Sequence, residues 1–466
     1  MLALAAALAI VVQDRASLRT APSGTAPELL ALPQGELLEL RGERAGYLKV
    51  YDYRRERGGF LRADAARAIG LEARDAPELL AVLRFLRDSP GSEALGISYG
   101  AAYLKAAPRG TPTAEPLDAI ARMAERLADQ ASGVGTRRTG AATRLEVAEG
   151  FGVHTRTLER EGRMQICYDG ELFRRVLLLP DATAEMRAAA ALGLTRPECV
   201  DPQAGALLRA SLDGERRRVL DEVADTDLSA LTRARLHARR AAVFASIAWE
   251  EARVHSPCVE AAQRALTELL AVHPDDLGDD RHNEYREALL RVAAIRWAVG
   301  SVTPLTGSLL LRTSPGEPGQ TCIELLQLRK DLETPLARRC TYGIVWTGSA
   351  RAIPQGPALA LAVQPLESWR ELWLFHETAG TWTIDVVSPG LENPVAGYVE
   401  FAGFVPATRR ILVVREVRER GGIRRRFEEL RLDDLVLMRQ ATVPELLPDF
   451  ARWQDPDWRR GTLALR

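Results

Sequence analysis

The stretch ASLRTAPSGTAPELLALPQGELLELRGERAGYLKVYDYRRERGGFLRAD, residues 16–64, decides the fold class of the N-terminal part of the chain. Its apolar runs are too short for helices, and turn-forming residues separate them at 33–35 (PQG), 44–46 (RAG) and 57–59 (RGG). Short strands with regular turns are typical of a small β-barrel. We therefore predict a barrel over residues 10–67.

Four segments of this stretch resemble the bacterial SH3 (SH3b) family. ASLRTAP (16–22) is similar to the family's opening N-V-R-x-G-P-S, and LLALPQGELLEL (29–40) is similar to its strand pair V-I-G-x-L-x-x-G-x-x-V-x-V. GYLKV (46–50) and GFL (59–61) stand where the family has G-W-x-K-V and G-W-V. The resemblance implies a small binding barrel on an exported protein, with peptidoglycan or an envelope protein as its partner.

Aromatic residues of the predicted barrel are the candidate ligand-binding residues. Tyr47 and Phe60 stand where the family usually has tryptophan, and Tyr51 and Tyr53 lie between them. These four side chains could line a peptide- or glycan-binding face. The alternative, which the small size of the domain favours, is that they form its core.

The first twelve residues, MLALAAALAIVV, bear on the compartment. This apolar run is too short to span a bilayer, and Ala7-Leu8-Ala9 is a pattern that signal peptidases accept. We therefore predict a signal peptide over residues 1–9 and a periplasmic or secreted protein without an integral membrane segment after its removal. The alternative is that residues 10–12 supply the first strand of the barrel, which is compatible with cleavage after Ala9 or with a start further upstream.

Charge and composition exclude some partners. The chain has 62 Lys and Arg against 63 Asp and Glu, a net charge of −1, and the two signs are interleaved. Such a chain has no field to recruit nucleic acid or an anionic membrane. Its 466 residues are enough for several domains.

Residues 72–300 are predicted to form a mainly helical domain. Apolar residues recur at helical spacing in segments such as 77–88 and 116–131, and prolines mark the breaks. The Gly-, Ala- and Pro-rich segment 94–113 is predicted to be a loop with a short helical piece. Alternating apolar residues near 144–168 predict inserted strands. We expect this domain to be a scaffold.

Residues 305–445 are predicted to form an antiparallel β domain, followed by a C-terminal tail at 446–466. Two stretches of it are similar to one another, 346–374 and 401–432. FVPATRRILV (404–413) resembles the W-S-P-D-G-x-x-L-x-V segment of TolB-type or WD40-like propeller blades, without its Asp-Gly turn. The resemblance implies blade-like repeats, and both a closed propeller and an open sheet remain compatible with the length.

The five cysteines fit an oxidising compartment. Cys322 and Cys340 lie in neighbouring predicted strands, and we predict a disulfide between them. One further pair can form among Cys167, Cys199 and Cys258: Cys167 with Cys199 is nearer in sequence, whereas Cys199 with Cys258 would join two helix starts.

No motif for catalysis, metal binding or cofactor binding is recognised. The six histidines are scattered and are best interpreted as surface or capping residues, and the sequence contains no His-Glu-x-x-His, Cys-x-x-Cys or phosphate-binding loop in context. We therefore predict no catalytic residues, no metal and no cofactor. The expected protein is a multi-domain α+β, exported, non-enzymatic binding or scaffold protein of the bacterial envelope. The alternative is a cell-wall hydrolase.

Overall fold

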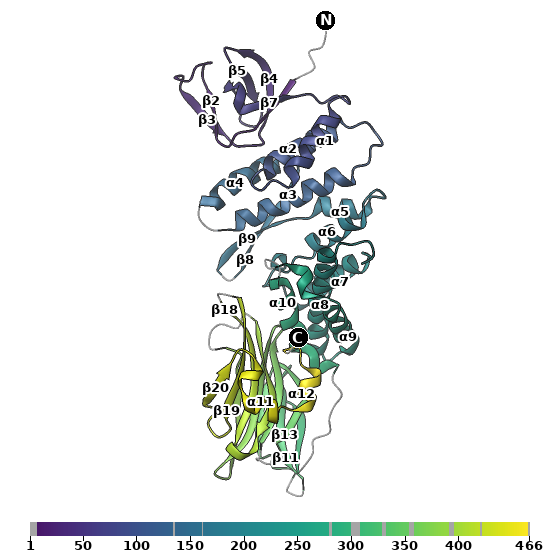
Figure 1. Ribbon diagram of the computed structural model, residues 1–466, viewed down its shortest axis with the longest axis vertical. Coiled ribbons are helices and arrows are strands. Elements are labelled where there is room, and N and C mark those ends of the chain that lie inside the picture. The colour runs from purple at the N-terminus through teal and green to yellow at the C-terminus, as the bar shows by residue number, and fades with distance from the viewer. Residues whose placement is uncertain are drawn as a thin grey trace. The chain divides into compact units, whose positions relative to one another are not determined.

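The computed structural model describes residues 7–133, 136–160, 162–278, 282–299, 308–328, 332–353, 358–390, 396–419 and 422–464 (Figure 1). The chain is a mixed α+β protein, as predicted. Its contacts divide it into two compact units, Met1–Gly205 with Val219–Leu228, and Ala206–Arg218 with Ser229–Arg466. The helices predicted at 72–300 are therefore divided between the two units.

The first unit begins with a seven-stranded sheet in the order β3-β2-β6-β5-β4-β1-β7. Its strands are β1 (Ala7–Val11), β2 (Ala16–Arg19), β3 (Glu28–Leu32), β4 (Leu37–Arg44), β5 (Tyr47–Asp52), β6 (Arg57–Arg62) and β7 (Ala66–Ile69). In the described part of the chain no pairing joins the edge strands β3 and β7, so the predicted barrel is wrong and the sheet is open. The physical reason is that helices cover the end of the sheet formed by β1 and β7. Ile10 of β1 and Ile69 of β7 pack with helical residues, on the face away from the core of the sheet.

Strand β1 explains the apolar run at the start of the sequence. Ala9 and Val11 belong to the core of the sheet, whereas Ile10 packs among helical residues on the other face, and all three are fully buried. A strand that is buried on both faces is continuously apolar. The predicted cleavage after Ala9 would remove three of the five residues of β1, and the remaining residues of the predicted signal peptide, 1–6, lie outside the described residues.

Helices make up most of the rest of the first unit. They are α1 (Ala76–Arg87), α2 (Glu93–Ala106), α3 (Ala114–Ser132), α4 (Thr136–Glu149), α5 (Glu171–Leu178) and α6 (Ala184–Leu194). The hairpin of β8 (Thr155–Arg160) and β9 (Arg163–Tyr168) is inserted between α4 and α5. The predicted strands near 144–168 thus begin at 155, because residues 144–149 end a helix. The loop predicted at 94–113 is wrong over most of α2.

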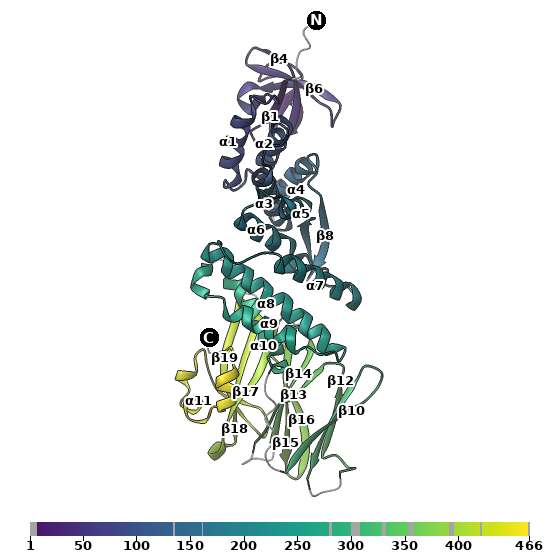
Figure 2. The same cartoon turned by 90° about the vertical axis from the view of Figure 1, so that its right-hand side faces the viewer.

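The second unit contains helices packed on strands. The helices α8 (Ala230–Arg253), α9 (Val259–Leu270) and α10 (His282–Ile295) share a core with Trp346 and Tyr398 of the β region, and α7 (Ala206–Asp221) begins in this unit. Figure 2 shows α8, α9 and α10 covering one end of the strands. None of the helices in the described ranges combines the length and the apolar composition that crossing a bilayer requires.

The β region has two sheets. A three-stranded sheet has the order β10-β11-β12, and an eight-stranded sheet has the order β13-β14-β15-β17-β18-β19-β20 with β16 paired to β15. The bounds are β10 (Leu309–Pro315), β11 (Thr321–Gln327), β12 (Ala337–Thr341), β13 (Ile344–Ile353), β14 (Ala358–Leu366), β15 (Trp369–Thr378), β16 (Thr381–Val387), β17 (Gly397–Val405), β18 (Arg410–Glu419), β19 (Gly422–Arg431) and β20 (Leu437–Ala441).

The eight-stranded sheet consists of two successive antiparallel meanders, β13 to β16 and β17 to β20. The two meanders are joined through β15, which pairs with a different strand in each half. Trp369 and Arg370 at its start pair in parallel with β17, and the residues from Leu372 onward pair with β16. Side chains of the two meanders, such as Leu374 and Val413, share one core. The other face of the first meander packs on the three-stranded sheet, where Ile323 contacts the same core as Leu361.

The similarity between 346–374 and 401–432 corresponds to equivalent strands of the two meanders. Each meander opens with a bulged strand, since the register shifts after Trp346 in β13 and after Phe401 in β17. In the described part of the chain the sheet ends at β13 and β20 and does not close into a ring. Of the two alternatives that the sequence left open, the structure therefore has the open arrangement.

The C-terminal residues belong to the second unit. Helices α11 (Pro448–Trp453) and α12 (Pro456–Gly461) cover the outer face of the second meander, where Phe450 and Trp458 are buried. The main chain continues this contact, because Asp455 N–H donates a hydrogen bond to Ala402 O. The segment predicted as a tail is therefore part of the core.

Candidate functional site

The four predicted ligand-binding residues are found at the surface of the N-terminal sheet. Tyr47 and Tyr51 lie on β5, Tyr53 follows that strand and Phe60 lies on β6. In β5 they alternate with Leu48 and Val50, which are buried. Because directly paired residues share a face, the pairing of Phe60 with Lys49 places Phe60 on the same side as Tyr47 and Tyr51. We call these four residues the aromatic face.

The core of this sheet is aliphatic. It contains Ala9, Val11, Ala16, Leu18, Leu32, Leu38, Leu48, Val50, Leu61, Ala65 and Ala66. The residues of the aromatic face are not among them: Tyr47, Tyr51 and Phe60 are half-buried and Tyr53 is 67% exposed. The alternative that the aromatic residues form the core is therefore wrong, because Ala, Val and Leu side chains fill the interior.

Tyr51 and Tyr53 form an ordered pair with charged neighbours. Their ring centroids are 5.0 Å apart in an edge-to-face arrangement, and the Arg41 guanidinium lies 3.9 Å from the centroid of the Tyr51 ring. Glu39 Oε2 accepts hydrogen bonds from Tyr53 Oη (3.1 Å) and Arg41 Nε (2.7 Å). The hydrogen bond from Arg41 lowers the pKa of Glu39, so the carboxylate stays charged near neutral pH.

A glycine gives Tyr51 its place on the sheet. Gly58 lies directly opposite Tyr51 in β6, and a Cβ atom at this glycine would come within 3.3 Å of the Tyr51 ring. The Cδ2 edge of the ring therefore lies close to the neighbouring strand, while Arg41 lies over one face of the ring. Fixed aromatic rings with an adjacent carboxylate and guanidinium can stack on sugar or aromatic groups and hydrogen-bond hydroxyl or amide groups.

A groove in the same unit is a site that the sequence did not reveal. It has a volume of about 820 Å³ and lies between the edge strand β7 and helices α1 and α2. Phe85, which is 75% exposed, and Tyr99 line it, and an ion pair of 2.6 Å joins Arg67 to Glu78 at its wall. The only available signal in the sequence was the apolar face of 77–88, which is also what a core helix needs.

The disulfides agree with the predicted compartment. The predicted Cys322–Cys340 disulfide is present, and Cys167 pairs with Cys199, which decides between the two alternatives. Cys258 is the free cysteine. Two disulfides are compatible with an exported protein.

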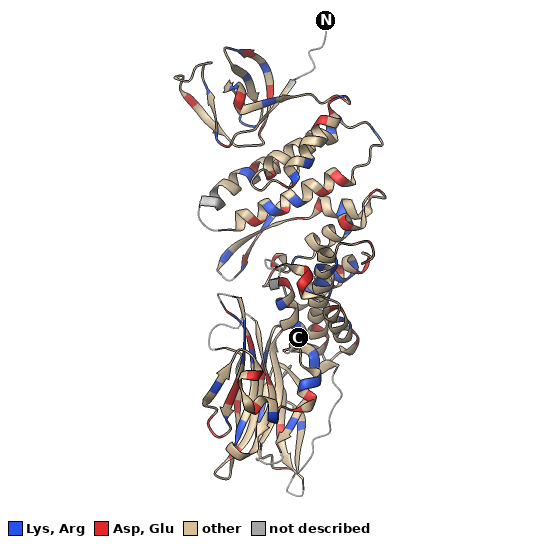
Figure 3. Ribbon diagram, viewed as in Figure 1, with Lys and Arg blue, Asp and Glu red and all other residues tan. Residues whose placement is uncertain are grey.

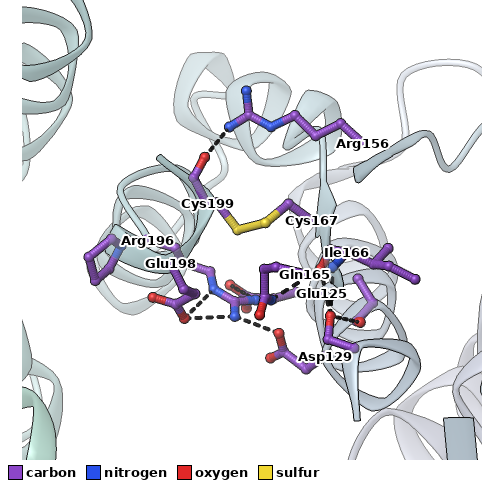
Figure 4. The surroundings of a disulfide bond; sticks show 12 residues. Glu125, Asp129, Arg156, Gln165, Ile166, Cys167, Arg196, Glu198 and Cys199 are labelled. Atoms are coloured by element: carbon purple, nitrogen blue, oxygen red, sulfur yellow. Dashed lines mark hydrogen bonds and ion pairs between the residues drawn. A yellow bond between two sulfur atoms is a disulfide. The ribbon is translucent and has the colours of Figure 1, made fainter. Parts of the chain in front are cut away.

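The Cys167–Cys199 disulfide joins the β8–β9 hairpin to the segment after α6 (Figure 4). Next to it, the Arg196 guanidinium pairs with Glu125, Asp129 and Glu198 at 3.6, 2.5 and 2.7 Å. Burial raises the pKa of Asp129 despite the nearby Arg196. On the hairpin side, Arg156 Nη2 donates a hydrogen bond of 2.7 Å to Cys199 O. The ion pairs therefore hold the segment after α6 against α3, and the disulfide and the Arg156 hydrogen bond join the hairpin to that segment.

Two histidines interpreted from sequence as surface residues are buried with carboxylate partners. His237 Nδ1 lies 2.6 Å from Glu268 Oε2, and His376 Nε2 lies 2.6 Å from Asp385 Oδ2. Their surface assignment is therefore wrong. Among the described residues no group of three or more His, Cys, Asp and Glu could hold a metal ion. Basic and acidic residues are interleaved along the chain (Figure 3).

Comparisons with known proteins add no relatives. No protein-family model matches the chain, and the searches of curated proteins and of solved structures found no significant match. The SH3b and propeller-blade resemblances therefore stay predictions.

Proposed function

We propose that this protein is an exported, non-enzymatic binding protein of the bacterial envelope, and that its aromatic face holds the ligand. The observation that carries the proposal is the position of Tyr47, Tyr51, Tyr53 and Phe60 outside an aliphatic core. A sheet whose interior is already filled does not need these rings for packing. Aromatic side chains that are kept at the surface of a small domain are suited to ligand contact.

The ligand class follows from the chemistry of this face. Tyr51 and Tyr53 offer ring surfaces at an edge-to-face angle, which suits sugar rings and aromatic side chains. Arg41 and Glu39 add one donor and one acceptor group beside them. Peptidoglycan presents both glycan and peptide, so it is the proposed ligand; an envelope protein is the other candidate.

The proposal predicts that the full-length protein sediments with purified peptidoglycan. Replacing both Tyr51 and Tyr53 with Ala removes the stacking surface, and we expect the apparent affinity to fall about tenfold or more, since such contacts contribute about 1 kcal/mol each. Circular dichroism checks that the sheet is folded. The matched control is Tyr342→Ala, which removes a tyrosine that is 62% exposed in the second unit and should leave binding unchanged.

The groove beside α1 supplies the second candidate site, and one further variant separates the two. Phe85→Ala removes the most exposed ring of the groove without touching β5 or β6. If peptidoglycan binding falls with Phe85→Ala and not with the double tyrosine variant, the ligand occupies the groove and the aromatic face is wrong as its site.

An activity assay tests the enzymatic alternative. The protein incubated with peptidoglycan should release no soluble muropeptides or reducing sugars over the background of a heat-denatured sample. Release that depends on folded protein would contradict the non-enzymatic proposal and would favour the cell-wall hydrolase.

A further inference from the structure

The Cys322–Cys340 disulfide lies on the outer face of the three-stranded sheet. Cys322 on β11 is directly opposite Cys340 on β12. The next residue of β11, Ile323, points to the other side and packs in the core shared with the first meander. The disulfide therefore joins two neighbouring strands on the side of the sheet away from that core.

The two cysteines differ in exposure. Cys322 is fully buried, whereas Cys340 is half-buried. The turn after β10 covers the first sulfur, since a Cβ atom at Gly316 would lie 2.9 Å from Cys322 Sγ. A thiolate that attacks a disulfide approaches along the S–S axis. Of the two cysteines, Cys340 is the more exposed, and it lies on an edge strand of the three-stranded sheet, so we take its sulfur as the one that is attacked.

A cation lies beside the buried sulfur. Arg338 Nη2 is 3.3 Å from Cys322 Sγ, and Arg338 Nε is 3.2 Å from Glu324 Oε1. In the register, Arg338 is directly opposite Glu324. This pair lies two residues along the strands from the disulfide and therefore on the same face of the sheet. A guanidinium beside a sulfur stabilises the thiolate form and so makes that sulfur a better leaving group.

We propose that Cys322–Cys340 is an exchangeable disulfide that reacts with small thiols of the glutathione class through Cys340. The incoming thiolate forms a bond to Cys340 Sγ, the Sγ–Sγ bond breaks, and its electron pair stays on Cys322 as a thiolate next to Arg338. A second thiolate then attacks the small-molecule sulfur of the mixed disulfide and releases Cys340 as a thiolate. Two thiols are oxidised to one disulfide while the protein disulfide is reduced to two thiols.

The other disulfide provides an internal control with different surroundings. Cys167 is buried and Cys199 is half-buried, so the exposure of the two cysteines resembles that of the Cys322–Cys340 pair. The difference is that Arg156 donates to the carbonyl oxygen of Cys199 rather than contacting a sulfur. Arg196 is bound by three carboxylates. The contact that distinguishes the Cys322–Cys340 disulfide is therefore the guanidinium of Arg338 beside the leaving sulfur, and we assign Cys167–Cys199 a structural role.

The test incubates the full-length protein with reduced glutathione, quenches samples with acid, alkylates free thiols and maps the peptides by mass spectrometry. We expect Cys322–Cys340 to open before Cys167–Cys199, and we expect the transient glutathione adduct on Cys340. Opening of both disulfides together, opening of Cys167–Cys199 first, or an adduct on Cys322 would overturn the proposal.

Variants of β12 test the role of the cation. Arg338→Gln should slow the opening about threefold to tenfold, as expected when a leaving thiol loses its stabilising charge. Arg338→Lys keeps the charge and should restore most of the rate. Arg339→Gln is the matched control, because Arg339 lies on the other face of the strand, 4.8 Å from the Trp373 ring centroid. Equal rates for Arg338→Gln and Arg339→Gln would show that Arg338 has no such role.

Discussion

Glu400 is a fully buried charge in the interior of the second unit. It lies on β17 and accepts hydrogen bonds from Arg296 Nε (2.6 Å), Arg370 Nη2 (2.7 Å), Trp458 Nε1 (2.9 Å) and Thr462 Oγ1 (2.8 Å). Burial alone would raise the pKa of Glu400, but the charges of Arg296 and Arg370 outweigh it and lower this pKa to about 2. One carboxylate thus joins three parts of the unit: the turn after α10, which carries Arg296, strand β15, which carries Arg370, and the C-terminal segment of Trp458 and Thr462.

This pKa predicts a dependence of stability on pH. A carboxylate whose pKa is lower in the folded than in the unfolded state stabilises the fold above about pH 4.5, and the contribution is lost as the pH falls toward 2. The shift corresponds to about 3 kcal/mol. Glu400→Gln should lower the free energy of unfolding by about 3 to 5 kcal/mol at pH 7, because two guanidinium groups remain buried without a counterion, and should flatten the acid dependence below pH 4.5.

Urea unfolding at pH 7 and at pH 3 measures both effects. The matched control is Asp434→Asn, which removes an exposed carboxylate paired with Arg431 at 2.8 Å in the same unit and should change little. An unchanged acid profile in Glu400→Gln would contradict the assignment. The sequence contained one signal for this residue, a single acidic side chain in the apolar strand GYVEFAGFV (397–405), but its partners come from distant segments and could not be predicted.

At the scale of elements, local patterns predicted strands better than they predicted small-residue helices. The β domain predicted at 305–445 is found as the strands β10 to β20, because alternation and β-branched or aromatic content are local signals. Helix α2 was missed because its glycines were interpreted as loop residues. In the structure these glycines lie where α2 meets α1 and α3, so tertiary packing decides the helix.

Gly100 provides a test of that interpretation. A Cβ atom there would lie 2.6 Å from Ile120 Cγ1 in α3, so Gly100→Ala should destabilise the protein by about 1 to 3 kcal/mol through overpacking. The matched control is Gly214→Ala in α7, where a Cβ meets nothing within 4 Å and the better helix propensity of Ala should stabilise by about 0.5 to 1 kcal/mol. Thermal unfolding of both variants gives the sign of each change. Destabilisation of equal size at both sites would contradict the packing argument.

At the scale of the whole molecule, the sequence predicted a mixed α+β chain and one disulfide but not how strands and helices combine. The compositional boundaries near 70 and 300 separate strands from helices, whereas the compact units each combine a sheet with helices. Amphipathic helices do not show in the sequence which strands they will cover. The aromatic residues were predicted as candidates, and only the structure showed that they lie outside the core. Their neighbours Arg41 and Glu39 were missed because the register across β4 and β5 is not a local property.

The two units and two disulfides together predict the unfolding behaviour of the chain. Each disulfide lies within one unit, Cys167–Cys199 in the first and Cys322–Cys340 in the second. Scanning calorimetry should resolve two transitions, because units with separate cores unfold separately.

Removing one disulfide should affect the transition of its own unit. The two disulfides close loops of 32 and 18 residues, which correspond to a stabilisation of about 3 to 4 kcal/mol each in the chain-entropy model. Replacing Cys167 and Cys199 with Ser should therefore lower only one transition, and replacing Cys322 and Cys340 only the other. Cys258→Ser, at the free cysteine, is the control and should move neither. A single transition that shifts with either pair would show that the two units unfold cooperatively.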